Sequence, residues 1–374
     1  MHYFDYAAAC PIRPEIVERY PAYCRCYFVN PHASTIFAEE CRRAILAAER
    51  RLLYCLAIPE ESAQVLWCSG GTEALNLAIL GLTETRKIRR IAFDPTAHPA
   101  MLEPLLKLQR QHTELVSLPV NHQGLLQPNT ATAAFPCSLL CCCQVNNETG
   151  QVQDLLRLRQ AFNQPCLFCI DAVQSLGKIH IPWQEAQLNL VALSARKIGG
   201  PASIGALIVR KGIKLTSQIL GGGQQHALRS GTLDTVAIQL FADCAELACQ
   251  NRVKEAERLR QLNQILRQGL QQLSQGKWPI FSNPDSVPDI LCFAIPGCEG
   301  ALVARFLAEQ KNILVGTGSA CSAESKKTSH VLAAMGVPPD LARCALRISF
   351  GYNSTQENLN ALLKALPEVL QKFR

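Results

Sequence analysis

The 374-residue sequence lacks any apolar run that approaches the roughly 18–20 residues a helix needs to cross a membrane. Its first residues, MHYFDYAAAC, do not place an apolar region after a positively charged one, so we expect no secretory signal. No basic run is longer than a few residues, although the formal net charge is +7. Internal repeats and low-complexity segments are also missing. These absences predict a cytoplasmic protein without a membrane anchor and without direct nucleic-acid binding.

Cysteine, in contrast, is abundant, with 18 residues. So many cysteines without a secretory signal indicate free thiols in a reducing compartment. Three clusters could suggest a metal site: Cys24 with Cys26, the consecutive Cys141, Cys142 and Cys143, and the C-x-x-C pair Cys166 and Cys169. The last two clusters lie in apolar, strand-like runs, where a free cysteine acts as a small hydrophobic residue. No second C-x-x-C pair stands at zinc-finger spacing, so we expect no metal site.

Apolar, strand-like runs alternate with helical patterns from about residue 65 to residue 210. The expected strands are 65–68, 90–94, 114–120, 138–145, 166–173, 190–195 and 204–210. Helical patterns such as 73–86 and 153–162 lie between several of them. Short strands that are apolar on both faces and alternate with helices predict a mostly parallel sheet covered on both sides. The expected fold class is therefore α/β.

The pattern changes after about residue 235. One long amphipathic helical stretch is expected over 235–275, and further strands and helices follow it. These strands are 290–296, 312–316 and 345–351, and the helices are 299–310 and 355–372. This second pattern predicts a smaller α+β domain. We expect a large domain over 15–258 and a small domain built from 1–14 and 259–374.

A glycine-rich turn joins an expected strand to an expected helix in CSGGTEALNLAI (68–79). Backbone N–H groups at a helix N-terminus bind anions, and the Thr72 hydroxyl adds a donor. A turn of this kind is by itself weak support for a phosphate site, because most such turns only connect two elements.

Two further residues strengthen the interpretation. Asp171 ends an apolar strand, and Lys197 follows the next strand in a segment rich in Ser and Gly. Pyridoxal 5'-phosphate needs a lysine to form a Schiff base, a carboxylate to keep its pyridine nitrogen protonated, and an anion-binding turn. Each residue alone could be an ordinary surface or turn residue. Together, at strand ends of an open α/β sheet, they predict a pyridoxal phosphate site.

Nine segments, in this order and spacing, carry a resemblance that runs nearly from end to end. They are YFDYAAACP (3–11), NPHAS (30–34), SGGTEALNLAI (69–79), TAHPAM (96–101), VNNETGQVQD (145–154), DAVQSLGK (171–178), GGGQQHALRSGT (221–232), GTGSACSAES (316–325) and LRISFG (346–351). The sequence resembles the cysteine desulfurases of the iron–sulfur-cluster type, within the class V aminotransferase fold group. The resemblance implies the type I fold of pyridoxal-phosphate-dependent transferases, with a large sheet of the seven-stranded type. It also implies conversion of L-cysteine to L-alanine and transfer of the sulfur to an acceptor protein.

The resemblance assigns roles by position. The expected cofactor contacts are Lys197 (Schiff base), Asp171 (pyridine nitrogen), Gln174 (phenolic oxygen), His98 (ring face and proton transfer), Asn147, and the phosphate-binding Gly71, Thr72 and Ser194. The expected substrate contacts are Asn30, Asn147 and Arg347, with the guanidinium forking onto the substrate carboxylate. Thr232 is expected to reach the phosphate of the neighbouring subunit, which implies a homodimer with shared sites.

Cys321, in GTGSACSAES, matches the catalytic cysteine of the family. Its thiolate is expected to attack the substrate sulfur, which leaves alanine and a persulfide on the enzyme. A reactive thiol must be accessible and partly ionised, and the small residues around Cys321 are typical of a loop rather than of a core. The pattern GSAC resembles the members of the family whose cysteine lies on a long loop.

Some features depart from the family pattern or leave the function open. Arg196 precedes Lys197 where the family usually has His, and GGGQQHA (221–227) lacks a charged pair. Arginine can pair with phosphate but cannot transfer protons near neutral pH.

A selenocysteine lyase or a cysteine or cystine C–S lyase would not need Cys321. A non-catalytic sulfur-relay paralogue would also not need Lys197 or Asp171. The sulfur acceptor is not identified by fold and chemistry.

Overall fold

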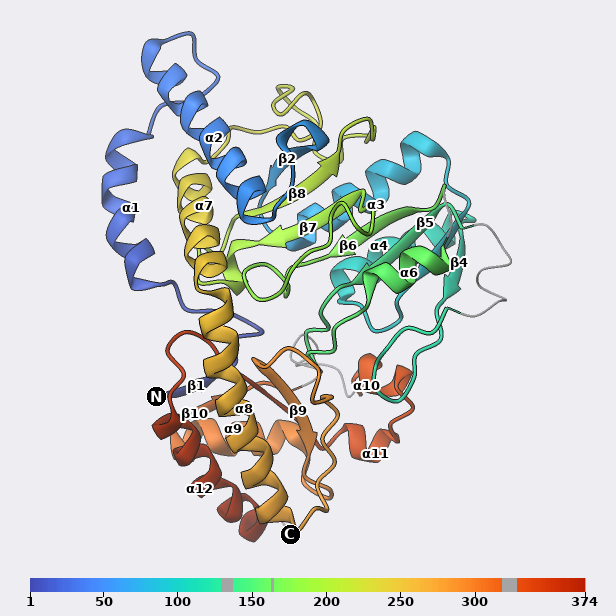
Figure 1. The fold of residues 1–374 in the computed structure, drawn as a ribbon, viewed down its shortest axis with the longest axis vertical. Helices are drawn as coiled ribbons and strands as arrows, with labels where there is room; N and C mark the ends of the chain where they lie inside the picture. The colour runs from blue at the N-terminus through green and yellow to red at the C-terminus, as the bar shows by residue number, and fades with distance from the viewer. Residues whose placement is uncertain (129–136, 163–164, 318–327, 374) are drawn as a thin grey trace.

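The structure is a computed structural model that describes residues 1–373 except for 129–136, 163–164 and 318–327. Its centre is a seven-stranded sheet, in the upper part of Figure 1, with the order β2-β8-β7-β6-β5-β3-β4. The strands are β2 (Ala63–Cys68), β3 (Arg90–Phe93), β4 (Glu114–Ser117), β5 (Leu139–Cys143), β6 (Leu167–Asp171), β7 (Leu190–Ser194) and β8 (Gly205–Arg210). β8 runs antiparallel to β2 and β7, and the other neighbours pair in parallel. The predicted α/β class with a mostly parallel sheet is confirmed.

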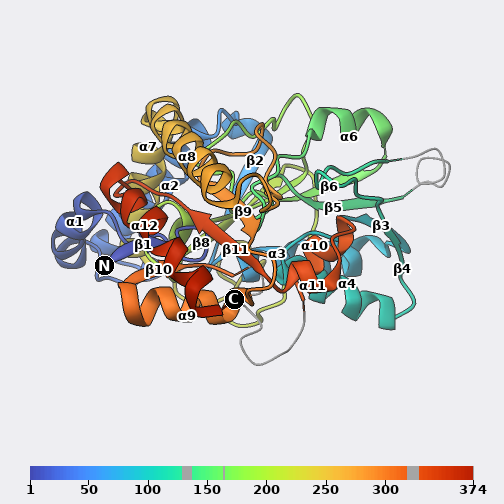
Figure 2. The same ribbon diagram turned by 90° about the horizontal axis from the view of Figure 1, so that it is seen from below.

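Helices cover both faces of this sheet, as Figure 2 shows from below. One face packs against α2 (Ile36–Cys55), α6 (Leu155–Ala161) and α7 (Thr235–Gln250), and α1 (Pro14–Cys26) lies outside α7. The other face packs against α3 (Gly71–Arg86) and α4 (Pro99–Arg110). Because successive strand residues point to opposite faces, Cys142 packs into the first layer and Cys141 into the second. This explains why these strands are apolar at every position.

The remaining elements form a second body, in the lower part of Figure 1, with its own hydrophobic core. Its strands are β1 (His2–Phe4) paired in parallel with β10 (Ile313–Val315), and β9 (Ile290–Ala294) paired antiparallel with β11 (Ala345–Ser349). Its helices are α8 (Arg252–Ser274), α9 (Gly300–Lys311), α10 (His330–Ala334), α11 (Pro339–Ala342) and α12 (Gln356–Phe373). The N-terminal strand therefore lies in the C-terminal body. The domain boundaries near residues 14 and 258 stay a prediction.

The expected single helical stretch over 235–275 is wrong in one respect. α7 ends at Gln250 and α8 begins at Arg252, so Asn251 separates two helices. The Asn251 side chain donates from Nδ2 to the Leu247 carbonyl at 2.8 Å, and its backbone N–H points to the same oxygen. Side-chain bonds of this kind to a backbone carbonyl are typical of asparagine, which favours caps and turns over helix interiors.

The structure also bears on membrane association. Of the helices that the structure describes, none combines the length and the apolar character that a membrane crossing requires.

Candidate active site

A cavity of about 540 Å³ lies at the carboxyl ends of the central strands. The ends of parallel strands meet at one edge of a sheet, and open α/β sheets bind their ligands there. Nine of the predicted site residues line this cavity: Gly71, Thr72, His98, Asn147, Asp171, Gln174, Ser194, Lys197 and Arg347. Residues from both bodies of the protein thus meet in one place.

Three predicted residues are not part of the described cavity lining. Asn30 is exposed in the connection between α1 and α2, and Thr232 is exposed just before α7. Cys321 lies outside the described residues. Within one chain, the structure therefore does not bring Asn30 or Thr232 to the cavity. Their predicted roles would need a neighbouring subunit.

The first turn of α3 lines the cavity. No side chain of the described residues caps this turn, so the backbone N–H groups of Gly71 and Thr72 are open to a ligand. A Cβ at Gly71 would lie 2.7 Å from Cγ2 of Val173. The missing side chain therefore lets the turn lie directly against the segment that follows β6. Arg196 is exposed and lines the same cavity.

Glu73 fixes the position of this turn. Its carboxylate accepts the Ser69 N–H at 2.8 Å and pairs with Arg229 at 2.7 Å. Burial favours a higher pKa for the Glu73 carboxyl, but the hydrogen bonds from Arg229 and Ser69 outweigh burial and lower the pKa. The turn is thus held by a charged pair behind the helix start, and its open N–H groups remain in the cavity.

Lys197 lies at the end of the short helix η2 (Ala195–Lys197), which directly follows β7. Its Nζ donates to the Ala8 carbonyl at 2.6 Å. Burial, followed by the positive charges of Arg347, Lys178 and Arg196, lowers the Lys197 pKa to about 8. A lysine amine that is partly neutral near pH 7 is a nucleophile, as formation of a Schiff base requires.

The lowered pKa predicts that Lys197 reacts with aldehydes at a lower pH than an ordinary lysine does. In the cofactor-free protein, labelling by a simple aldehyde and borohydride should be half-maximal near pH 8. The pKa of an unperturbed lysine side chain is about 10.4. Labelling rises with pH because loss of the proton frees the nitrogen lone pair. Peptide mass mapping measures each lysine in one digest, so exposed lysines serve as the control. A half-maximum near the ordinary lysine value at Lys197 would contradict the prediction.

Asp171 ends β6, and Gln174 follows it in the turn after the strand. The Asp171 Oδ1 accepts the Val173 N–H at 3.0 Å. Burial raises the Asp171 pKa to about 6, despite that bond and the nearby charge of Lys197. A buried carboxylate in this environment is stabilised by a cationic ligand group, such as a protonated ring nitrogen.

His98 is the N-cap residue of α4. Its Nδ1 accepts the Ala100 N–H at 3.0 Å, so the proton of the neutral ring is on Nε2. Burial, followed by the charges of Lys197, His330 and Arg347, lowers the His98 pKa to about 4. The ring is therefore neutral at pH 7 and able to lie against an aromatic ligand.

Arg347, on β11, lines the cavity from the second body. Its Nη1 donates to the Asn147 carbonyl at 2.9 Å, and its Nη2 pairs with Asp5 Oδ1 at 2.7 Å. Its Nε is buried, and no described residue accepts a hydrogen bond from it. The bonds to Asn147 and Asp5 hold the guanidinium in the cavity lining, where its planar set of N–H donors suits a ligand carboxylate.

Several cavity residues were missed by the sequence reasoning. The backbone carbonyls of Ala7 and Ala8 hold Gln174 and Lys197, and main-chain atoms leave no signal in a sequence. Glu148 is buried, and its Oε2 accepts the Ser329 hydroxyl at 2.5 Å. Burial raises the Glu148 pKa to about 7. Its only sequence signal is its place beside Asn147.

The cysteine clusters form no metal site in the part of the chain that the structure describes, because no three His, Cys, Asp or Glu side chains converge there. Cys141, Cys142 and Cys143 are buried free thiols of β5. Burial raises the pKa of these three thiols well above the ordinary value. They stay protonated and are poor nucleophiles.

Comparisons with known proteins find relatives that match almost the whole chain. The sequence model of the family described as aminotransferase class-V matches residues 2–362. The cysteine desulfurase IscS of Dictyoglomus turgidum is 32% identical over 377 residues, which cover 100% of this chain and 95% of that protein. A solved NifS-like protein has a TM-score of 0.90 at 26% identity and covers 99% of both chains. The structure of SspA in complex with cysteine has a TM-score of 0.80 at 28% identity, covering 94% of this chain and 99% of that one. The similarity extends over both bodies of the fold.

Proposed function

Because this chain belongs to the class V aminotransferase family, we propose that it is a pyridoxal-phosphate-dependent cysteine desulfurase. It converts L-cysteine to L-alanine and carries the sulfur as a persulfide on Cys321. A full-length relative named cysteine desulfurase supports this activity, and a solved relative in complex with cysteine supports the substrate. The observation that carries the proposal is one cavity that holds a half-buried lysine of lowered pKa, a buried carboxylate and an uncapped helix start.

The described residues fit the cofactor. The open N–H groups at the start of α3, together with Ser194, suit its phosphate, and the buried Asp171 suits its ring nitrogen. Gln174 and Lys197 line the same cavity, where Gln174 would meet its phenolic oxygen and Lys197 would supply the amine for its aldehyde. When bound, pyridoxal phosphate supplies an electron sink next to the reacting carbon of the substrate.

The side chains of this chain bind and orient the substrate and move its protons. Arg347 would take the substrate carboxylate through its guanidinium N–H groups, while Asp5 and Asn147 keep the guanidinium plane fixed. Lys197 holds and returns a proton at Nζ, which its lowered pKa permits near neutral pH. His98, neutral at pH 7, would lie against the cofactor ring, and any proton it passes on would come from Nε2, because Nδ1 accepts the Ala100 N–H.

Cys321 is the proposed sulfur acceptor. Its thiolate bonds to the substrate sulfur, the sulfur–carbon bond breaks, and the electron pair stays on the carbon, which takes up a proton to give alanine. The described residues on either side of its segment support this role. Thr328 and Ser329 line the cavity, and Gly316 lies against Arg347, since a Cβ there would be 2.9 Å from Nη2.

We also propose a homodimer in the cytoplasm with sites shared between subunits. Thr232 and Asn30 are exposed and lie outside the cavity of their own chain, as residues that serve a partner would. Apolar side chains next to Asn30 are exposed as well, among them Phe28, Ile36 and Phe37. The many free thiols support a reducing compartment. A separate acceptor protein takes up the sulfur.

A single-turnover reaction with L-cysteine and no added reductant tests the proposed function. Alanine release should match, mole for mole, a protein mass gain of one sulfur atom in intact-mass spectra. Protein stripped of cofactor is the control and should give neither product. Pyruvate with free sulfide would instead identify a C–S lyase. A protein that binds no pyridoxal phosphate and releases no product would be a non-catalytic relay protein.

A further inference from the structure

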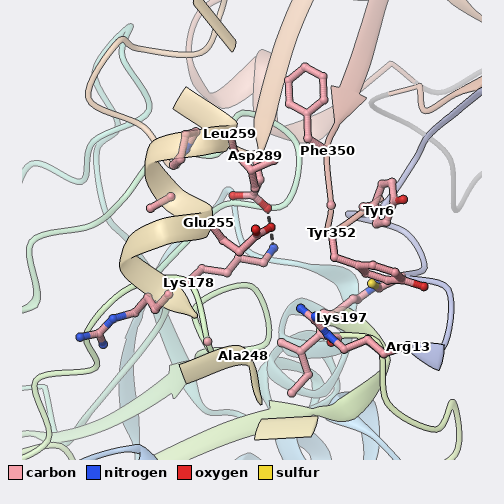
Figure 3. A pocket seen from close by; sticks show the side chains of 17 residues that line it. Tyr6, Arg13, Lys178, Lys197, Ala248, Glu255, Leu259, Asp289, Phe350 and Tyr352 are labelled. Atoms are coloured by element: carbon pink, nitrogen blue, oxygen red, sulfur yellow. Dashed lines mark hydrogen bonds and ion pairs between the residues drawn. The ribbon is translucent and has the colours of Figure 1, made fainter. Parts of the chain in front are cut away.

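Lys197 also lines a second, smaller cavity of about 70 Å³, where the two bodies of the protein meet. Figure 3 shows Lys178 in this cavity, with its ammonium group beside Asp289. The Nζ–Oδ2 distance is 2.7 Å, and the two side chains are only 19% and 6% exposed. Lys178 follows β6 in the sheet body, whereas Asp289 directly precedes β9. This ion pair therefore joins the two bodies next to the active cavity.

Gly177 places Lys178 in this position. Its backbone has a φ of +71°, and a Cβ there would lie 2.5 Å from Cβ of Ala248 on α7. Glycine is the residue that allows both this conformation and this close approach. The segment after β6 therefore lies directly on α7, and the next residue, Lys178, extends toward the other body.

Lys178 also contacts Gln174, a residue that lines the active cavity. Its Nζ donates to Oε1 of Gln174 at 2.8 Å, and Nε2 of Gln174 donates to the Ala7 carbonyl at 2.8 Å. An ammonium group can only donate and a carbonyl can only accept, so these partners allow one orientation of the amide. In that orientation the second N–H of Nε2 is left for a ligand in the cavity that Gln174 lines.

We propose that Lys178 is a positioning residue that holds the Gln174 amide with its N–H donor toward the cofactor, and that Asp289 anchors Lys178 for this task. The inference rests on the proposed function, in which Gln174 meets the phenolic oxygen of pyridoxal phosphate. A reversed amide would place its oxygen against that phenolic oxygen, and the two acceptors would repel each other. A simple ion pair between the bodies would not need the contact with Gln174.

The test compares Lys178→Met with the wild type after loading with pyridoxal phosphate. The readout is the pH midpoint at which the visible absorption band of the bound cofactor changes. The midpoint should rise by about one unit in Lys178→Met, because a positive charge and a fixed donor are both lost. Lys178→Arg keeps the charge and the donors and should shift it less. Lys254→Met, at an exposed lysine of α8, is the matched control and should leave the midpoint unchanged.

The Gln174→Ala variant separates the effect of the fixed Gln174 amide on the midpoint from the effect of the Lys178 charge. The other charged groups that act on Lys197, namely Arg347, Arg196 and Asp171, are the same in every variant. In the Gln174→Ala background, Lys178→Met should therefore give a smaller shift, because only the charge is lost. An equal shift in both backgrounds would overturn the positioning role.

Crystal structures of the cofactor-free wild type and Lys178→Met provide the second readout. The Gln174 side chain should keep its bond to the Ala7 carbonyl in the wild type and lose its single position in the variant. An unmoved Gln174 would overturn the proposal, whatever the spectra show. If wild type gave no visible band with pyridoxal phosphate, the proposed function would fail, and the two crystal structures would still decide the role of Lys178.

Discussion

Replacing Lys197 by alanine is expected to lower the rate of alanine formation from L-cysteine by about 10³–10⁴-fold. The variant loses the amine that binds the cofactor and the group that holds a proton at Nζ. The described structure offers no replacement amine, because Lys178, the nearby lysine, is engaged by Asp289 and Gln174. Steady-state turnover, measured as alanine per protein with saturating pyridoxal phosphate, gives the size of the loss.

The Lys197→Ala variant needs a control for folding and for charge. Lys254→Met removes an exposed lysine of α8 and should retain the wild-type rate. The Lys197 variant should also lack the visible band of covalently bound cofactor. Turnover within tenfold of wild type would show that another residue carries this chemistry and would remove Lys197 from the proposed site.

Replacing Cys321 by alanine should abolish the persulfide and lower the rate of alanine formation by a factor of at least about 100. The visible band of the bound cofactor should stay unchanged. The effect is large because other thiols near the site are poor substitutes. Cys10 lines the smaller cavity beside Lys197, but burial raises its pKa to about 11, so it is protonated at neutral pH. Cys143 lines the active cavity, and burial raises its pKa as well. Intact mass after one turnover measures the sulfur that the protein retains.

Cys24→Ala is the matched control, because Cys24 is an exposed free thiol of α1. It should gain one sulfur atom as the wild type does. If Cys321→Ala formed product as fast as wild type, the thiol would not be the sulfur acceptor. Release of pyruvate and sulfide by both proteins would then favour the C–S lyase over the desulfurase.

The central sheet was predictable from sequence because its strands are buried on both faces. Every residue of β5, β6 and β7 is buried, which gives unbroken apolar runs. α1 was not predicted, and it contains Pro21, a residue that opposes a helix interior. β1 has three residues and is a strand because β10 lies beside it. Such elements depend on contacts between distant parts of the chain, which local patterns do not contain.

The candidate site shows the same division. That Asp171 and Lys197 lie at one cavity could be predicted, because strand ends in an α/β sheet converge. The position of Arg347 beside Asn147 could not, because it depends on how the two bodies meet. The roles of the Ala7 and Ala8 carbonyls could not be predicted either, since any residue supplies a carbonyl. Lys178 ends the segment DAVQSLGK, but its contacts with Gln174 and Asp289 could not be predicted from that segment.

The contacts of the N-terminal segment have a consequence for how the protein folds during translation. The Ala7 N–H donates to Oγ of Ser349, and Asp5 pairs with Arg347, so the first residues to be synthesised bind some of the last. The carbonyls of Ala7 and Ala8 can therefore not take their places until translation has passed β11. A stalled nascent chain would contain Lys197, Asp171 and the turn at Gly71, yet it would have no finished cavity. The active cavity can therefore be completed only after β11 has been synthesised.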